Sequence, residues 1–320
     1  MTHKHYIAFF LLLPFLFSCQ EDENPNAELD ERLNEQIAEI ETYLSDNNIS
    51  TAVENGYYLE QITENPDGKV PQQEDVVLAY YNLQTLDGSP IDQLSQADGD
   101  EPAAIPYIQG RVILPIALYD LIGDMRAGEE VRAYVPFNRA YFDYELADVI
   151  PALTAIILQL EVVDVLSPEE FALRQNTQIK AYLQESKLQP ADSLEGGVYY
   201  HRVQSGESPE VDDQSTVRVR YTGSLLDGTQ FDSNVDAPTP FRVVMSEDGV
   251  ISGFKTGLSV MSQLEEGVAV MPAAEAYGPN YFFIPFAAMS DFIAVGAVPG
   301  SARLGTYAIL RFDLEVESVN

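Results

Sequence analysis

Residues 217–232 read VRVRYTGSLLDGTQFD, and residues 77–92 read VLAYYNLQTLDGSPID. In each stretch a strand-like run leads into Leu-Asp-Gly and then a second short run. Asp-Gly between two such runs is a strong hairpin signal, because glycine tolerates the positive φ that the turn requires. Tyr81 and Tyr221 are 140 residues apart, and so are Asp92 and Asp232. This equal offset indicates that one structural unit occurs twice.

The flanking segments follow the same order in both copies. Each copy has an Ala-Tyr pair, at residues 140–141 and 276–277, and then a closing apolar strand. An apolar stripe with helical spacing precedes the first copy, at Leu29, Leu33, Ile37, Ile40 and Leu44. We therefore expect an α+β protein with two similar domains. Each would be a twisted antiparallel β-sheet wrapped around a short α-helix and preceded by an amphipathic helix.

The length of 320 residues fits about two domains of roughly 150 residues each. Leu-Ser-Pro at residues 166–168 marks the joint between them. The expected organisation is a signal peptide at 1–19, an acidic tether and helix at 20–50, a first domain at 51–166, a helical linker at 167–190 and a second domain at 191–320.

Composition excludes several classes of function. The chain has 51 acidic and 17 basic residues, a net charge of -34, so it repels phosphate backbones and nucleic acid is not an expected partner. Cys19 is the single cysteine, which excludes disulfides within the chain and cysteine-type zinc sites. Of the three histidines, only His201 lies beyond Cys19, too few for a multi-histidine metal site. We expect neither a metal nor a cofactor.

The N-terminus carries a targeting signal. An apolar run at residues 7–17 follows Lys4 and is too short to span a bilayer, as in a signal peptide. It ends in LFSC at 16–19, which resembles a bacterial lipobox and would make Cys19 a lipidated N-terminus. An ordinary signal peptide with an incidental cysteine is the alternative. The expected location is the bacterial cell envelope, with the chain lipid-anchored to the outer membrane and facing the periplasm or the surface.

The second copy resembles the FKBP-type peptidyl-prolyl isomerases. Seven separated blocks carry the resemblance: VRYTG at 219–223, DGTQFDS at 227–233, PF at 240–241, VISGF at 250–254, GL at 257–258, AYG at 276–278 and FD at 312–313. In that family a pocket lies between the sheet and its short helix, which the resemblance places here at about residues 254–262.

The resemblance implies the site residues. The catalytic group would be Tyr221, Asp232, Ile251 and Tyr277. In it the Tyr277 hydroxyl and the Ile251 N–H donate to substrate carbonyl groups, and Asp232 accepts a hydrogen bond from Tyr221. The substrate-binding wall would be Phe231, Phe241, Val250, Phe254 and Phe312, with Phe254 at the floor. The alternative is that these aromatic residues belong to an ordinary core.

The reaction suits a chain with so few reactive side chains. Rotation about a peptide bond has a barrier of about 18–20 kcal/mol, because amide resonance is lost at the midpoint. X-Pro bonds populate both isomers and exchange slowly. A catalyst needs only to bind the twisted amide better than the planar forms, and an apolar bowl that excludes water does this without a metal or a cofactor.

Both copies depart from the family pattern. The second has an apolar insertion at residues 279–305, which would select substrates, recruit a protein partner or plug the pocket. The first has Ile91, Ile116, Phe142 and Leu158 at family aromatic or glycine positions, which predicts a weak or inactive pocket; Tyr107 there matches Phe241. We also expect Glu265 on the surface.

The sequence thus favours a peptidyl-prolyl isomerase that acts on proline-containing polypeptides and assists protein folding outside the cytoplasm. The alternative is a non-catalytic lipoprotein in which tandem FKBP-like domains bind peptides or partners. A purely structural lipoprotein is the third hypothesis.

Overall fold

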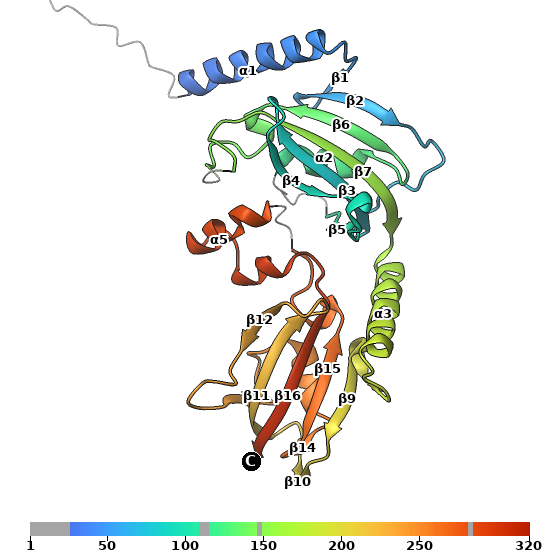
Figure 1. The fold of residues 1–320 in the computed structure, drawn as a ribbon, viewed down its shortest axis with the longest axis vertical. Coiled ribbons are helices and arrows are strands. Elements are labelled where there is room, and N and C mark those ends of the chain that lie inside the picture. Colours follow the sequence, from blue (N-terminus) through green and yellow to red (C-terminus); the bar gives the residue numbers. More distant parts are fainter. Residues whose placement is uncertain (1–25, 109–114, 146–148, 281–283) are drawn as a thin grey trace, which may run out of the picture.

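The computed structural model describes residues 26–108, 115–145, 149–280 and 284–320 (Figure 1). Cys19 and the predicted signal peptide lie outside the described residues. No helix within the described ranges is both long and apolar enough to cross a membrane.

The first half of the chain forms a seven-stranded sheet with the order β1-β2-β6-β7-β3-β4, and β5 pairs with β3. All its pairings are antiparallel. Its elements are α1 (Ala27–Asp46), β1 (Ala52–Glu54), β2 (Tyr57–Thr63), β3 (Val76–Thr85), β4 (Pro90–Leu94), η1 (Gln96–Asp98), β5 (Ala103–Pro106), α2 (Ile116–Asp124), β6 (Glu130–Val135), η2 (Phe137–Arg139) and β7 (Ile156–Leu166).

The second half repeats this architecture, with the strand order β12-β11-β16-β15-β9-β8 and β13 on β11. Its elements are α3 (Pro168–Glu185), β8 (Asp192–Ser193), η3 (Glu195–Gly197), β9 (Tyr199–Gln204), β10 (Glu207–Glu210), β11 (Thr216–Leu225), β12 (Gln230–Ser233), β13 (Phe241–Val244), α4 (Ser252–Leu258), β14 (Ser262–Gln263), β15 (Glu266–Met271), η4 (Ala273–Glu275), α5 (Phe286–Ala294), η5 (Gly300–Leu304) and β16 (Leu310–Val319). The expected α+β fold class is confirmed.

The helix that precedes each sheet is held by a buried glutamine. On α1, the Gln36 side chain accepts a hydrogen bond from the Phe137 N–H (2.9 Å) and donates to the Leu153 carbonyl. On α3, Gln175 accepts from the Ala273 N–H (3.1 Å) and donates to the Tyr307 carbonyl (2.8 Å). Both glutamines are buried, so these bonds satisfy groups that water cannot reach. The same clamp therefore docks the helix in both domains.

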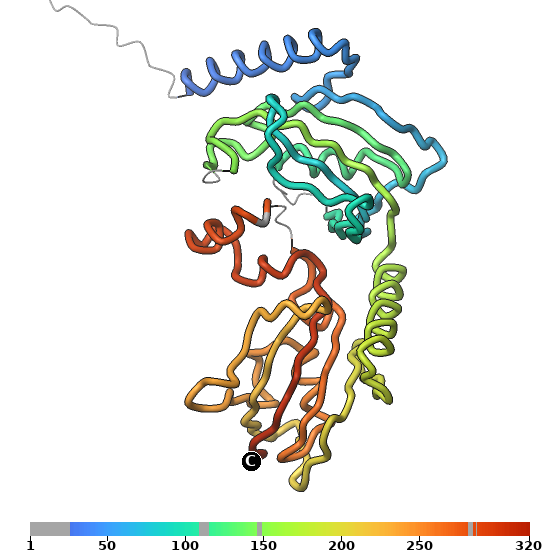
Figure 2. The backbone as a smooth tube through the Cα atoms, in the orientation of Figure 1, coloured from blue at the N-terminus to red at the C-terminus, as the bar shows by residue number. Residues whose placement is uncertain are grey.

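Helix α3 also joins the two domains along one side of the molecule, as Figures 1 and 2 show. Its start is fixed by a capping box, in which Ser167 and Glu170 satisfy each other's backbone N–H groups, and by Pro168 in the first turn. The ring of Phe171 on α3 lies 4.7 Å from the ring of Tyr307, centroid to centroid.

The insertion of the second domain packs against the first domain. Figures 1 and 2 show α5 and η5 between the two sheets, next to the first one. Six of its residues belong to the buried cluster at the centre of the first domain: Ile284, Ala288, Met289, Phe292, Val298 and Ala302. The Phe292 ring lies 5.2 Å from that of Tyr144. These apolar side chains of the insertion thus contact the first domain of the same chain. Residues 281–283 of the insertion are not among the residues that the structure describes.

Two sequence expectations were wrong in detail. The short helix of the second domain is α4, which ends at Leu258, and Ser262 belongs instead to β14, where it pairs with Glu210 of β10. Glu265 is 2% exposed, because its carboxylate accepts hydrogen bonds from Arg202 and from the Tyr200 hydroxyl, both at 2.7 Å. Charged residues are rarely buried unless they are paired in this way.

Candidate active site

A pocket of about 400 Å³ opens in the second domain between the sheet and α4. Side chains from four strands, from α4 and from two loops converge on it. Its lining consists of Tyr221, Asp232, Phe241, Gly249, Val250, Ile251, Phe254, Tyr277 and Phe312.

The floor of the pocket is a set of interlocked aromatic rings. Phe254 and Phe312 are 3% and 4% exposed, and their rings meet edge to face at 5.0 Å and 87°. The Tyr221 ring stands edge-on to Phe254, at 5.5 Å and 82°. Edge-to-face packing is a favoured aromatic geometry, so each ring holds the next in place. The floor is therefore both apolar and rigid.

The mouth of the pocket is open and partly polar. Phe241 is 38% exposed and Tyr277 is 50% exposed. The Tyr221 hydroxyl donates to the Asp232 carboxylate at 2.7 Å. Burial, and then the negative charge of Asp232, raise the pKa of Tyr277, so its phenol stays protonated and is a hydrogen-bond donor at neutral pH.

Ile251 joins the loop to α4. It is the N-cap residue, with extended φ and ψ of -60° and 146°, and its carbonyl accepts from the Phe254 N–H at 3.2 Å. Its own N–H makes no hydrogen bond to any residue that the structure describes. An N-cap position leaves backbone donors near the helix start available. A ligand carbonyl in the pocket would satisfy this N–H.

Eight of the nine residues expected at the site line this pocket, and Phe231 does not. The Phe231 ring packs edge to face against Phe312, at 5.7 Å and 89°. Gly223 gives it room, because a Cβ at that position would lie 2.7 Å from the Phe231 ring. Phe231 thus contacts the pocket wall through Phe312. Gly249 is a lining residue that sequence reasoning missed, although Asp-Gly at 248–249 is a turn signal.

The first domain keeps the polar part of this arrangement. The Tyr81 hydroxyl donates to Asp92 at 3.1 Å, as Tyr221 does to Asp232. Tyr141, at the position of Tyr277, is only 2% exposed. Burial, followed by the charges of Asp92 and Tyr81, raises its pKa well above the ordinary value. Tyr141 belongs to the buried cluster against which Tyr81 packs.

The aromatic wall is absent from the first domain. Val219 pairs with Phe241 on β13, whereas Ala79, 140 residues earlier, pairs with Ala103 on β5. Ala103, and not Tyr107 as expected, therefore stands in the place of Phe241. Helices α2 and α4 begin 136 residues apart, which puts Leu118 in the place of Phe254. The expectation that Ile116 takes this floor position was wrong.

The pocket of the second domain combines an apolar floor with hydrogen-bond donors at its mouth, which suits a small apolar group attached to a carbonyl. In the part of the chain that the structure describes, no three His, Cys, Asp or Glu side chains gather as a metal site would require. The apolar floor and the donors at the mouth offer binding and orientation of such a group.

One family model matches both halves of the chain, and each of the relatives named below matches less than half of it. The model of the family described as FKBP-type peptidyl-prolyl cis-trans isomerase matches residues 68–163 and 207–314. FK506-binding protein 1 of Candida glabrata is 31% identical over 131 residues, which are 41% of this chain and 99% of that protein. FK506-binding protein 1 of Saccharomyces cerevisiae is 34% identical over 133 residues, 41% of this chain and 99% of that protein. Outer membrane protein MIP of Legionella longbeachae is 35% identical over 101 residues, 31% of this chain and 42% of that protein.

Proposed function

Since this chain belongs to the FKBP-type peptidyl-prolyl cis-trans isomerase family, we propose that the pocket of its second domain is where a proline-containing polypeptide is isomerised. The proline ring sits on the floor formed by Phe254 and Phe312, against the edge of Tyr221. The Tyr277 hydroxyl and the Ile251 N–H donate to substrate carbonyl groups. Asp232, held by Tyr221, faces the carbonyl that rotates.

The catalytic effect comes from binding the twisted amide more tightly than the planar forms. The aromatic floor removes water from the amide, and the loss of resonance is less costly in an apolar environment. Each 1.36 kcal/mol of preferential binding accelerates the reaction about tenfold. The side chains named above supply this preference without forming a covalent bond to the substrate.

The observation that carries this proposal is the difference in access between two equivalent tyrosines. Tyr277 is half exposed at the mouth of an aromatic pocket, whereas Tyr141 is buried beneath the insertion. Only the second domain joins the Tyr–Asp pair to an open aromatic bowl. The activity is therefore assigned to this domain.

A cis-to-trans isomerase assay on the full chain, with a panel of X-Pro peptides, tests the assignment. We expect Phe254→Ala to abolish the acceleration, and Tyr277→Phe to lower kcat/KM about 3- to 10-fold, since a hydrogen bond contributes about 0.5–1.5 kcal/mol. Tyr141→Phe and Leu118→Ala are the matched controls in the first domain and should leave the rate unchanged. A folded Phe254→Ala protein with the wild-type rate would contradict the proposal.

We also propose that the protein works in the bacterial cell envelope, anchored through a lipid on Cys19. The lipobox-like LFSC at 16–19 supports this, and so does the similarity to a protein named for the outer membrane. Labelled palmitate should be incorporated into the wild-type chain and not into a Cys19→Ser variant. Equal labelling of both would refute the anchor.

A non-catalytic binding protein is the second candidate, because side chains of the insertion join the buried cluster of the first domain that includes Tyr141. Under this hypothesis the second pocket binds X-Pro peptides, and Phe254→Ala removes binding, but no peptide of the panel is isomerised faster. The same assay, combined with a peptide titration, separates the two functions.

A further inference from the structure

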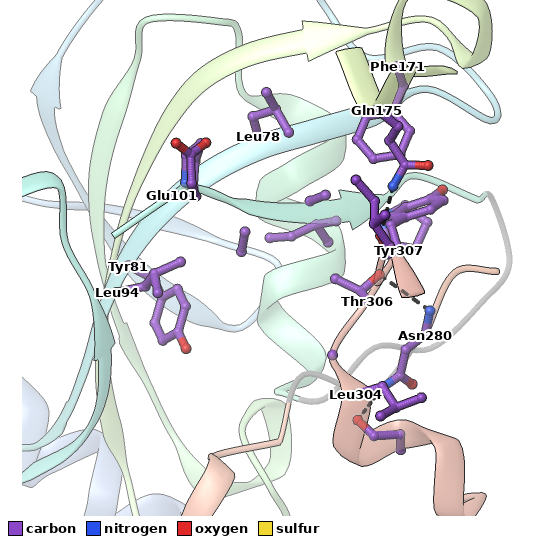
Figure 3. Close-up of a pocket in the computed structure, with 18 of the residues that line it drawn as sticks. Leu78, Tyr81, Leu94, Glu101, Phe171, Gln175, Asn280, Leu304, Thr306 and Tyr307 are labelled. Atoms are coloured by element: carbon purple, nitrogen blue, oxygen red, sulfur yellow. Dashed lines mark hydrogen bonds between the residues drawn. The ribbon is translucent and has the colours of Figure 1, made fainter. Parts of the chain in front are cut away.

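A cavity of about 650 Å³ lies between the two domains and shares no lining residue with the pocket at Phe254. Figure 3 shows its lining, which comes from the first sheet, from α3 and from residues 280–309 of the second domain. Neither domain alone builds it. Its volume lies within the range of about 300–1,000 Å³ that is usual for ligand sites.

The walls of this cavity are apolar and its charges balance. Leu78 and Leu94 line it from the first sheet, and Leu304 and Tyr307 from the second domain (Figure 3). The charged lining residues are two acids and two bases, namely Asp92, Glu101, Arg174 and Arg303. Arg174 and Glu101 already form an ion pair of 2.7 Å. The cavity therefore favours an uncharged, apolar ligand.

One side of the cavity is the free edge of a β-strand. Strand β5 pairs with β3 and, within the described residues, with no other strand. Its four consecutive residues, 103–106, all line the cavity. Neighbouring side chains of a strand point to opposite faces of the sheet. Four consecutive residues can therefore all line one cavity when the cavity runs along the edge of the strand. A free edge presents backbone N–H and C=O groups that an extended polypeptide segment can pair with.

The Tyr–Asp pair of the first domain is part of the cavity wall. Tyr81 and Asp92 both line it, and Tyr81 packs against the buried cluster that contains Tyr141. The Tyr141 hydroxyl is buried and has no hydrogen-bond partner among the residues that the structure describes. A buried polar group without a partner costs about 1–3 kcal/mol, so it requires an explanation.

Two side chains of the insertion, Ile284 and Met289, line the cavity and also belong to the buried cluster that includes Tyr141. A methionine side chain adapts readily, because it is unbranched and has three rotatable bonds. A ligand that displaces these two side chains would bring a carbonyl oxygen to the Tyr141 hydroxyl.

We propose that the interdomain cavity is a second polypeptide-binding site, distinct from the isomerase pocket. It takes a short, extended, apolar segment, which pairs with the free edge of β5 and accepts a hydrogen bond from Tyr141. Recognition rests on backbone groups and apolar side chains, so proline is not required. A chain held there stays attached while the other domain acts on its X-Pro bonds.

A proline-free peptide isolates this site from the isomerase pocket. The probe is a fluorescein-labelled Ala-Leu-Ala-Leu-Ala peptide, and its binding to the full chain is measured by fluorescence anisotropy. Ala104 is half-buried in the lining and pairs with Leu78, so Ala104→Phe fills the cavity and should weaken binding at least tenfold. Ala38→Phe, on the exposed side of α1, is the matched control and should leave binding unchanged.

If Ala104→Phe does not fold, the binding proposal can still be tested with Tyr141→Phe, which removes only a single oxygen atom. We expect it to weaken binding about 3- to 10-fold. Photo-crosslinking of a benzophenone form of the peptide should label residues 103–106 and 302–307. Phe254→Ala should abolish isomerase activity and leave this binding intact, so failure of either function is recognised separately. Unchanged peptide affinity in both Ala104→Phe and Tyr141→Phe would overturn the proposal. It would also be overturned if decanoic acid displaced the peptide while Tyr141→Phe had no effect, because the cavity would then bind apolar chains without recognising a peptide carbonyl.

Discussion

The two domains have the same strand order and the same tyrosine–carboxylate pair, yet Tyr277 is half exposed whereas its counterpart Tyr141 is buried. In the second domain the pair borders a bowl of aromatic rings. In the first, Ala103 and Leu118 replace two of those rings. Apolar side chains of the insertion fill part of the space that smaller residues leave, because a core tolerates few voids.

The comparison suggests how a duplicated unit acquires a new role. Once the aromatic wall is gone, the first domain cannot grip a proline ring, but its apolar hollow remains a good surface for burial. The insertion of the second domain packs against the first domain, so Phe292 of α5 is 4% exposed and belongs to the buried cluster of the other domain. A former pocket becomes an interdomain contact.

The largest expected effect is on this contact. Phe292→Ala should reduce the stability of the docked insertion by about 3–5 kcal/mol, the usual cost of truncating a buried phenylalanine. Hydrogen exchange should then increase in the first domain and in α5, while isomerase activity is retained. Val295→Ala, in the same loop and 76% exposed, should change neither. Unaltered exchange in Phe292→Ala would mean that the insertion does not stabilise the first domain.

A smaller effect separates two equivalent acids. Glu265 and Glu129 each accept a hydrogen bond from the N–H three residues earlier, but only Glu265 also accepts from Arg202 and Tyr200. Burial raises the pKa of Glu265, and the hydrogen bonds from Arg202, Tyr200 and Ser262 outweigh it and lower the pKa below the ordinary 4.5. Its contribution to stability is therefore present above pH 4.5 and is lost as the pH falls through the folded-state pKa.

Glu265→Gln should lower the free energy of unfolding by about 2 kcal/mol at pH 7, since hydrogen bonds to charged groups contribute about 1.5–3 kcal/mol. The difference from wild type should shrink when urea unfolding is repeated below pH 4.5. Glu129→Gln, the matched change in the first domain, should cost less. A pH-independent difference would show that the charge of Glu265 is not what stabilises the fold.

The smallest effect has the opposite sign. Tyr141→Phe should raise the melting temperature and add about 1 kcal/mol of stability, because it removes a buried hydroxyl without a partner. Tyr277→Phe, at the half-exposed equivalent, should leave stability unchanged. A destabilised Tyr141→Phe protein would indicate that the hydroxyl is already satisfied in the free protein.

Much of the site was predictable because its signals are local or are repeated at fixed spacing. The family resemblance implied the hydrogen bond between Tyr221 and Asp232, and the equal spacing of the two copies pointed to Tyr81 and Asp92 as their counterparts. Phe231 was assigned to the pocket because its spacing is right, but whether a ring lies in front of or behind Phe312 depends on packing. The covered state of Tyr141 was invisible for the same reason.

The sequence by itself determined the duplication and the α+β class, because periodicity, turn residues and motif spacing are properties of short segments. Its resemblance to a known family implied the Tyr221–Asp232 pair and most of the aromatic pocket. Only the tertiary structure decided where residues 284–304 are buried, which glutamines clamp α1 and α3, and that a cavity forms between the domains. These features depend on contacts between residues more than 100 positions apart, such as Gln36 with Phe137 and Gln175 with Tyr307. An apolar or amide side chain makes such contacts with any surface of suitable shape, so its partner is chosen by the assembled fold.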